Sequence, residues 1–380
     1  MVKTDLVKGF ADYTGDDARK RAVIQEVVRQ VFEKYNFEPA ETPVIEYEDF
    51  VKGNNSDDEA VSDIYKLQDK GKRKLALRYE FTFQLKRIAK NKKLPYKRFQ
   101  IGPVFRDEPV AGVRNRQFTT CEADIVGATI KDQAEIFAIV KDILNALKIK
   151  SVIYINNRKL LNEIIGNLGI KKNVEVIREI DKLDKLSEKE VRENLKKYGA
   201  EEILLILKKD EKFFEKYNGY AEVKALREAC KMYGIEIKFS PFLARGLSYY
   251  NGTVFEVKSD IKETVCGGGA YMFEENQCFG FGVSIERLQA VAKLIVDIEK
   301  YLVVSLNQDR KAIAISKQLR AKGKNASVYF GKPSKALEYA NAYGIKKVVF
   351  VGEQEVKKKI IMVKDMKSGR EQRLIVTKLN

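Results

Sequence analysis

Hydrophobic residues recur with two clear periods along the first 300 residues of the chain. Residues 16–35 follow a helical period, which places four apolar side chains on one face: Val23, Val27, Val28 and Phe32. The same period predicts a helix over residues 132–147, and shorter apolar patterns predict helices over 81–89 and 159–168. Nearly every segment from about 171 to 234 favours helix, so we expect an all-helical block there.

Strands are predicted where apolar and polar residues alternate, or where short β-branched runs lie between turn formers. Two long strands are expected at residues 98–108 and 117–126, joined by a polar loop over 109–116. Shorter extended segments are expected at four places: a hairpin over 63–78, and strands at 152–155, 235–247 and 253–257. Residues 37–51 form an extended segment whose prolines confine it to a sheet edge, where another subunit could pair with it.

After about residue 300 the pattern changes to short strands that alternate with helices. This alternation is typical of a small α/β domain with a largely parallel sheet. We therefore predict two domains, one over residues 1–298 and one over 299–380. The first domain mixes helices with strands and carries the helical block, at about 171–234, as an insertion. The expected fold class is α+β.

The chain of 380 residues carries a formal net charge of +17 and contains no histidine. The charge indicates a polyanionic partner such as a nucleic acid. The lack of imidazole excludes histidine acid–base catalysis, histidine-containing triads and histidine-ligated metals. The four cysteines form no CxxC pair, and neither a secretory signal nor an apolar run of about 18 residues is visible. We therefore expect a reduced, cytoplasmic protein without a membrane span.

The strand–loop–strand segment over residues 98–126 carries the densest candidate chemistry. Alternation places Arg106 and Glu108 on one face of its first arm. One face of the second arm carries four candidate side chains: Phe118, Thr120, Glu122 and Asp124. Arginine clamps phosphate oxygens bidentately and an aromatic ring can stack on a base, so the pattern suits a nucleotide beside an ammonium group. The alternative is a plain strand pair with a solvated charged face.

Three further stretches carry residue types that agree with a nucleotide site. They are LRYEFT at residues 77–82, LARGLSYYNGTVFE at 243–256, and GFGVSIERL at 280–288. Together with FRDE and RNRQF in the segment above, they resemble the class II aminoacyl-tRNA synthetases, and specifically the histidyl-tRNA synthetase family. The resemblance covers nearly the whole chain in order, from VKGFADY near the N-terminus to GEQEVKKKIIMVKDMKSGREQ near the C-terminus.

The resemblance implies a fold and a reaction. The fold is an antiparallel sheet of about six strands flanked by helices, with a helical insertion and a C-terminal α/β anticodon-binding domain. The segment over residues 37–51 is similar to the family motif that builds a homodimer interface. The reaction uses ATP, with Mg²⁺, to convert histidine into its adenylate and pyrophosphate. The histidyl group then passes to the 3′ end of tRNA(His).

The resemblance also assigns roles to individual residues. Three arginines are implied to be catalytic: Arg106 and Arg245 at the α-phosphate and Arg287 at the γ-phosphate. The ATP contacts are completed by Glu108 and Phe118, which meet adenine. The amino-acid contacts are Glu80, Thr82, Thr120, Asp124, Arg245, Tyr249 and Tyr250. Among these, Asp124 and Tyr250 resemble the pair that reads the imidazole. No metal ligand is implied, and no general base is needed, since the substrate carboxylate is already the nucleophile.

Three positions depart from the family pattern. Thr120 stands where a glutamine is usual, Ser248 where an acidic residue precedes the tyrosine pair, and Ala270 where an arginine precedes a tyrosine. The glycine triplet at 267–269 predicts either a tight turn or a close approach of backbone to substrate.

Two alternatives to an active histidine enzyme therefore stay open. One is a non-catalytic relative, either a regulatory subunit of histidine biosynthesis or a sensor of uncharged tRNA. Such regulatory relatives lack the anticodon-binding domain, whereas residues 301–380 look intact. The other is a similar enzyme for a different amino acid, which only Thr120, Ser248 and Ala270 favour.

Overall fold

A computed structural model describes residues 4–53, 59–245, 248–261, 263–358 and 360–375. By its contacts the chain divides into two compact units, Met1–Ile295 and Val296–Asn380. Each unit is described by itself below. The functional domains expected at 1–298 and 299–380 stay a prediction.

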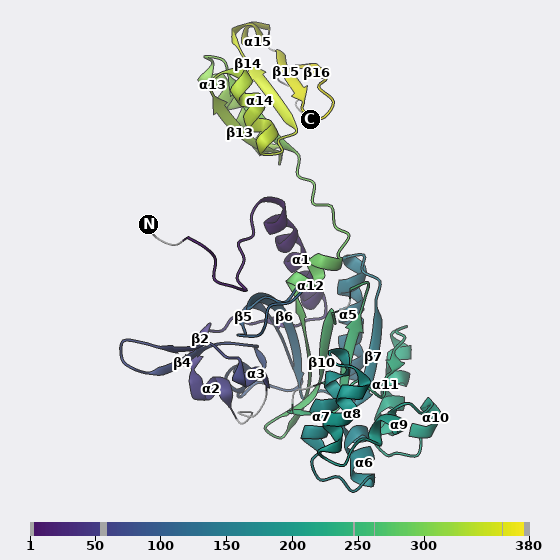
Figure 1. Cartoon of the computed structure of the whole chain (residues 1–380). Coiled ribbons are helices and arrows are strands. Elements are labelled where there is room, and N and C mark those ends of the chain that lie inside the picture. The colour runs from purple at the N-terminus through teal and green to yellow at the C-terminus, as the bar shows by residue number, and fades with distance from the viewer. Residues whose placement is uncertain (1–3, 54–58, 246–247, 262, 359, 376–380) are drawn as a thin grey trace. The chain divides into compact units, whose positions relative to one another are not determined.

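The first unit is built on a large twisted sheet (Figure 1). Among the described residues the sheet has eight strands, in the order β1-β5-β6-β11-β10-β9-β7-β8. Their bounds are β1 Glu38–Pro39, β5 Tyr96–Phe105, β6 Gln117–Val126, β11 Asn276–Ser284, β10 Cys266–Phe273, β9 Tyr250–Lys258, β7 Val152–Asn157 and β8 Lys238–Phe239. The six central strands pair antiparallel, and the two-residue strands β1 and β8 pair parallel at the edges. The expected antiparallel sheet is thus confirmed, with two short strands added.

Helices cover one face of this sheet and form the main hydrophobic core with it. They are α1 Gly15–Lys34, α5 Ile130–Ala146, α11 Tyr220–Met232 and α12 Ile285–Val291. The buried face of α1 carries Ile24, Val28, Val31 and Phe32. The predicted Val23 is instead 38% exposed, because the buried stripe begins one position later and follows the i, i+4, i+7, i+8 spacing.

A small three-stranded sheet, ordered β2-β4-β3, lies beside the main sheet (Figure 1). Its strands are β2 Ile45–Tyr47, β4 Lys74–Leu77 and β3 Lys66–Gln68, which confirms the predicted hairpin. The extended segment expected to reach residue 51 ends earlier, since α2 (Glu48–Lys52) is helical. The predicted helix at 81–89 consists of a 3-10 turn, η1 Thr82–Gln84, followed by the short α4, Leu85–Ile88.

The block between β7 and β8 is helical, as predicted. Its elements are α6 Arg158–Asn167, α7 Asn173–Asp181, η2 Lys182–Asp184, α8 Glu188–Lys196, α9 Ile203–Leu207, α10 Glu211–Phe214 and α11. Val176, Leu204 and Leu226 are buried in the same core as the main sheet, so the block is packed against it. The strand predicted over 235–247 is wrong in length: only Lys238–Phe239 pairs, because Pro241 offers no N–H to a ladder. Residues 246 and 247 lie outside the described residues.

The described part of the second unit contains a five-stranded sheet in the order β13-β12-β14-β15-β16. Its strands are β12 Lys300–Ser305, β13 Asn325–Phe330, β14 Lys347–Val351, β15 Ile360–Asp365 and β16 Glu371–Ile375. Strand β12 pairs parallel with β13 and β14, while β15 and β16 are antiparallel. Helices α13 Asp309–Ala321 and α14 Pro333–Ala342 bury apolar residues against opposite faces, and α15 is Glu353–Lys358. This unit has the predicted α/β character. In neither unit is a described helix both long and apolar enough to span a bilayer.

Candidate active site

The main sheet carries a pocket on the face opposite to the helical core. Strand β6 shows the division, because Cys121, Ala123 and Ile125 enter the core while Thr120 and Asp124 line the pocket. The free space of the pocket is about 1000 Å³ when the open solvent at its mouth is included.

All the site residues predicted from the sequence line this one pocket. They are Glu80, Thr82, Arg106, Glu108, Phe118, Thr120, Asp124, Arg245, Tyr249, Tyr250 and Arg287. They come from segments up to about 200 positions apart, and the order of strands in the sheet brings them together. The structure shows that these residues line one pocket, and the role of each residue is a proposal.

Glycines make room for the pocket floor. A Cβ atom at Gly268 would lie 2.1 Å from the carbonyl oxygen of Gly280, and one at Gly280 would lie 2.0 Å from Asp124 Oδ1. Both distances are far below van der Waals contact, so these positions exclude larger residues. The triplet at 267–269 lies inside β10 and lines the pocket, so the alternative of a tight turn is wrong.

Four arginines line the pocket: Arg106, Arg114, Arg245 and Arg287. Burial lowers the pKa of Arg287, and the positive charges of Arg114, Arg106 and Arg245 lower it further. A guanidinium stays charged under these conditions, so the cluster is a preformed site for several negative charges.

A chain of hydrogen bonds links Arg245 to Arg287 through Glu256 on β9 and Thr264, which precedes β10. Arg245 Nη1 donates to Glu256 Oε1 at 2.8 Å, and the Thr264 hydroxyl donates to Glu256 Oε2 at 2.9 Å. The carbonyl oxygen of Thr264 accepts from Arg287 Nη1 at 2.6 Å. Arg245 itself has φ +57°, a conformation that few non-glycine residues adopt. Burial alone would lower its pKa, but Tyr250 and Glu256 hold the pKa above its ordinary value.

Carboxyl groups line the same pocket: Glu80, Glu122 and Asp124. Burial raises the pKa of Glu80 to about 8, with a further contribution from the charge of Glu122. Burial also raises the pKa of Glu122, whose Oε2 accepts from the Phe81 N–H at 3.0 Å. These buried carboxyls favour a positively charged ligand, which would restore the ionised form that burial disfavours.

Asp124 is held by two partners that sequence reasoning missed. Its Oδ2 lies 2.9 Å from Nη2 of Arg98, and both side chains are almost fully buried. Its Oδ1 accepts from the Tyr271 hydroxyl at 2.6 Å. Burial raises the pKa of Asp124, and Arg98 opposes that rise. Alternation along the strand places Arg98 on the same face as Arg106, which was a sign in the sequence that it could belong to the site. Only the register of β5 with β6, however, places Arg98 opposite Asp124.

Phe118 and Arg106 lie together at the ends of β6 and β5. The guanidinium carbon of Arg106 is 5.3 Å from the centroid of the Phe118 ring, and its Nε donates to the Tyr79 carbonyl at 3.1 Å. Arg106 Nη1 lies 3.7 Å from Glu108 Oε1. The open face of the ring and the free edge of the guanidinium can therefore meet one ligand that is flat at one end and anionic at the other.

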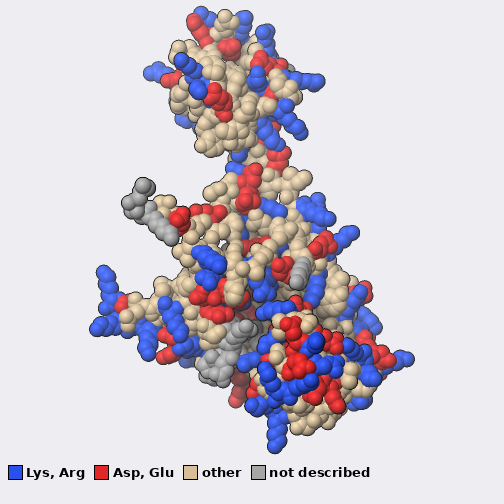
Figure 2. Space-filling model, viewed as in Figure 1, with Lys and Arg blue, Asp and Glu red and all other residues tan. Residues whose placement is uncertain are grey.

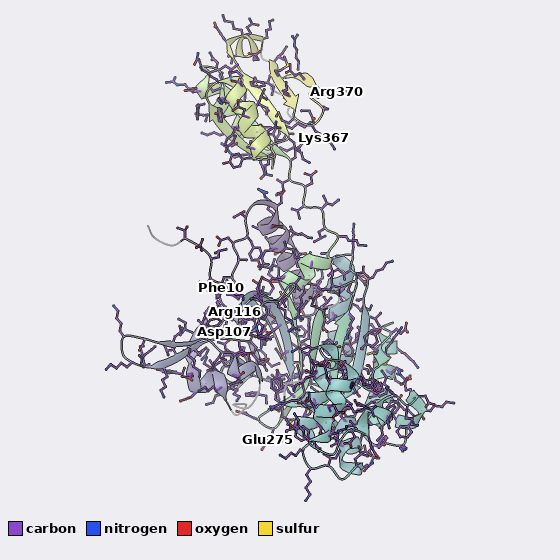
Figure 3. The ribbon with its side chains drawn as sticks, in the orientation of Figure 1. Phe10, Asp107, Arg116, Glu275, Lys367 and Arg370 are labelled. Atoms are coloured by element: carbon purple, nitrogen blue, oxygen red, sulfur yellow. The ribbon has the colours of Figure 1, made fainter. Side chains whose placement is uncertain are left out.

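The N-terminal segment fixes the loop between β5 and β6. The carbonyl oxygen of Gly9 accepts from the N–H groups of Arg116 and Gln117 at 2.8 and 3.2 Å. Arg116 in turn pairs with Asp107 at 3.0 Å, and Figure 3 shows Phe10, Arg116 and Asp107 near one another at this loop. The loop that carries Glu108 is thus supported from outside the pocket.

The three departures from the family pattern have different positions. Thr120 lines the pocket and is 4% exposed, so it directly shapes the ligand site. Ala270 is buried in the helical core, on the other face of β10. Ser248 borders a separate small cavity with Arg158, Arg178 and Tyr250.

Comparison with known proteins decides the family. Residues 9–288 match the sequence profile described as Histidyl-tRNA synthetase, and residues 300–379 match the one described as Anticodon binding domain. The chain belongs to the histidyl-tRNA synthetase family. The resemblance drawn from the sequence motifs is thereby confirmed.

Curated relatives of this family align over the full chain. A Histidine--tRNA ligase from Wolinella succinogenes is 34% identical and covers 97% of this chain and 95% of its own length. Histidine--tRNA ligase 2 of Shouchella clausii is 31% identical, with 96% and 97% covered.

Solved structures show the same fold. The histidyl-tRNA synthetase from Nostoc sp. PCC 7120 superposes with a TM-score of 0.83 at 24% identity, over 99% of this chain and 97% of that one. A protein from Bacillus halodurans C, titled an ATP phosphoribosyltransferase regulatory subunit/histidyl-tRNA synthetase, gives 0.77 at 19% identity, over 92% and 99%.

Proposed function

We propose that this protein is a histidine–tRNA ligase, which activates histidine with ATP and transfers it to tRNA(His). The observation that carries the proposal is one pocket that is lined both by four arginines and by three buried carboxyls. ATP carries several negative charges, whereas histidine carries an ammonium group and an imidazole that can donate. Full-length relatives with this activity in their names support the same function.

The arginines would bind and polarise ATP. Phe118 stacks on adenine, Glu108 accepts from the adenine amino group, and Arg106 binds the α-phosphate. Arg287 meets the γ-phosphate. The adenine therefore lies toward the loop between β5 and β6, and the phosphates lie over β10 and β11.

The carboxyls would bind histidine. Glu80, with Thr82 and Thr120, meets the α-ammonium group, and Tyr249 donates to Glu80 at 3.4 Å. Asp124 and Tyr250 face the imidazole, which needs a partner for each ring nitrogen. Because Tyr271 and Arg98 hold Asp124, its carboxylate is already oriented when the substrate arrives.

The first step is attack of the histidine carboxylate oxygen on the α-phosphorus of ATP. The bond from phosphorus to the bridging oxygen breaks, and pyrophosphate leaves with the electron pair. Arg106 and Arg245 stabilise the charge that develops on the α-phosphate, an effect typically worth a few kcal/mol for each fixed donor. In the second step a terminal hydroxyl of tRNA attacks the carbonyl carbon, and AMP leaves.

Mg²⁺ would enter with the nucleotide. Among the described residues no group of three or more Asp, Glu, Cys or His side chains could hold a metal ion. Mg²⁺ in such sites is commonly bound by substrate phosphates and water, so the phosphates of ATP would hold the ion. The ion would supply charge neutralisation at the phosphates.

We further propose that the protein is a cytoplasmic homodimer. The sheet ends at β1, a two-residue edge strand that contains Pro39, and the neighbouring β2 exposes Ile45 and Tyr47. An exposed apolar edge of this kind can pair with a second copy.

The test is ATP–pyrophosphate exchange with each of the twenty amino acids. We expect exchange with histidine alone, since buried polar groups reject side chains that leave them unpaired by up to about four orders of magnitude. Exchange with another amino acid would reassign the substrate. An absence of exchange, with ATP and tRNA still bound, would favour a non-catalytic relative.

A further inference from the structure

Glu122 is a buried carboxyl in the pocket that has no role in the proposed reaction. It lies on β6 between Thr120 and Asp124 and lines the pocket, yet only 8% of the residue is exposed. Glu80 and Asp124, the other two carboxyls, already have proposed contacts with histidine. Burying a carboxylate without a partner of opposite charge is costly, so a third buried carboxyl calls for an explanation.

Within the described part of the chain, the carboxylate of Glu122 has a single hydrogen-bond donor. Its Oε2 accepts from the Phe81 N–H at 3.0 Å, and no described lysine or arginine forms an ion pair with it. The buried arginines nearby have other partners: Arg98 pairs with Asp124 at 2.9 Å, and Arg78 donates to two backbone carbonyl oxygens. The second oxygen of Glu122, Oε1, is therefore left for a donor that enters the pocket.

Carboxylates on the outer surface are placed differently. Figure 2 shows red and blue side chains intermixed over the helical block. In that block Glu188 Oε1 lies 2.7 Å from Lys208 Nζ and 3.2 Å from Arg192 Nη2. Such charges balance each other within the protein. Glu122 has no balancing pair of this kind, so a positively charged ligand is its natural partner.

Glu122 lies beside the proposed position of the α-ammonium group. Burial raises the pKa of Glu80 to about 8, and the charge of Glu122 is the next largest cause, so the two carboxyls are close enough to repel. A Cβ atom at Gly282 would lie 3.3 Å from Cγ of Glu122 and 3.5 Å from Oγ1 of Thr120. The side chains of Glu122 and Thr120 thus lie over the same glycine, within the group of residues proposed to meet the ammonium.

The chemistry of an ammonium group requires more than one acceptor. It carries three N–H donors, and a hydrogen bond from it to a carboxylate is stronger than one to a neutral oxygen. Thr120 stands where a glutamine is usual in this family, so its short hydroxyl leaves room over Gly282. Glu122, two residues further along the same face of β6, brings a longer side chain and a full charge to that room.

We propose that Glu122 binds the α-ammonium group of histidine together with Glu80, and that it offsets the short side chain of Thr120. This inference rests on the proposed function and deepens it by adding a residue to the amino-acid site. Two carboxyls directed at one ammonium group disfavour any ligand that lacks it. The pocket would therefore select an amino acid and discriminate against other imidazole compounds.

The test uses the full-length protein with three small molecules. Histidine carries both an ammonium group and a carboxylate, histamine carries only the ammonium group, and 3-(imidazol-4-yl)propionate carries only the carboxylate. The test variant is Glu122→Gln, whose amide keeps an oxygen for the Phe81 N–H and nearly the same volume. The matched control is Glu135→Gln, which changes a partly buried carboxylate on α5 that pairs with Lys97, on the helical face of the sheet.

Isothermal titration calorimetry measures the affinity of each molecule. We expect Glu122→Gln to weaken binding of histidine and of histamine by about tenfold or more, because a charge-assisted hydrogen bond is lost. Binding of the propionate should be unchanged, and it also reports that the pocket is folded. In pyrophosphate exchange the KM for histidine should rise while the KM for ATP stays the same. Glu135→Gln should behave as the parent does.

Equal losses for all three molecules would overturn the inference, since Glu122 would then act on the imidazole or on the fold. Parent-like affinity for histidine in Glu122→Gln would overturn it too, as would matching rises in the KM for ATP and for histidine. If the parent shows no histidine-dependent exchange while Glu122→Gln loses affinity only for the two ammonium-bearing molecules, the proposed function fails and the inference stands.

Discussion

Glu256 on β9 holds Arg245 in place: its Oε1 accepts from Nη1 of Arg245 at 2.8 Å. The other oxygen of Glu256 accepts from Thr264, whose carbonyl oxygen binds Arg287. One buried carboxylate therefore positions two arginines that come from separate motifs. Two arginines placed before the substrate binds need no reorganisation during the reaction.

Variants that disrupt the hydrogen bonds linking Arg245, Glu256 and Arg287 should slow adenylate formation. Arg245→Ala should reduce pyrophosphate exchange by about two or more orders of magnitude, because a preorganised cation is lost. Glu256→Gln should reduce the exchange rate by about tenfold, since Arg245 stays but is less firmly oriented. Asp260→Asn, which changes an exposed carboxylate nearby, serves as the control. If Arg245→Ala retains exchange within about threefold of the parent, Arg245 is not catalytic.

Asp124 should matter for stability as well as for substrate choice. Asp124→Ala leaves Arg98 buried without its charge partner, so we expect a loss of about 3–5 kcal/mol in the free energy of unfolding. The double variant Asp124→Leu with Arg98→Met removes both charges and should recover much of that loss. Urea unfolding monitored by circular dichroism measures both. An unchanged urea midpoint in Asp124→Ala would contradict the pairing.

For this reason the binding role of Asp124 is better tested with Asp124→Asn. The amide keeps an oxygen for the Tyr271 hydroxyl and nearly the same volume. We expect histidine-dependent exchange to fall while the fold persists.

Histidine affinity should depend on pH through Glu80. Its pKa of about 8 means that most molecules of the free protein carry a neutral Glu80 at pH 7. Only the ionised form attracts the α-ammonium group, so affinity rises as the pH rises through the pKa. Between pH 7 and pH 8 the ionised fraction grows about fivefold, and the affinity for histidine should follow. Equilibrium dialysis of labelled histidine measures this, and Glu80→Gln should bind weakly with no pH dependence across that interval.

Phe118 should act on ATP and not on histidine. Phe118→Leu removes the ring, and stacking on a base is worth about 1–3 kcal/mol, so the KM for ATP should rise by about tenfold or more. The KM for histidine should change little, and Phe118→Tyr should behave as the parent. Steady-state exchange with each substrate varied in turn separates the two effects. Equal changes in both Michaelis constants would place Phe118 elsewhere than at the adenine.

The sequence alone was sufficient to predict the antiparallel sheet, the helical insertion and the α/β character of the last 80 residues or so. Strand alternation also predicted which side of β6 faces the pocket, because the alternation of Phe118, Thr120 and Asp124 along the strand does not depend on distant segments. Family motifs then brought residues of β9 and α12 to the same pocket.

Other features could not be predicted, because they depend on register between distant strands. From the sequence Arg98 is predicted only as a strand residue, because its position opposite Asp124 depends on the register of β5 with β6. The sequence assigned no role to Glu256, because its contact with Arg245 depends on the path of the loop before β9. The glycine triplet was ambiguous because a local pattern cannot distinguish a turn from a crowded strand; the carbonyl of Gly280 decides it.

The pairing of β6 with β11 affects how the protein folds during its synthesis on the ribosome. About 150 residues separate the end of β6 from the start of β11, and at about 5–20 residues per second their synthesis takes about 8 to 30 seconds. During that time the β5–β6 hairpin can form, but the outer edge of β6 has no partner. Such an open strand edge is a template on which neighbouring nascent chains can join. Because the pocket combines strands from distant parts of the chain, the time between the synthesis of β6 and of β11 sets how long this edge stays open to other chains.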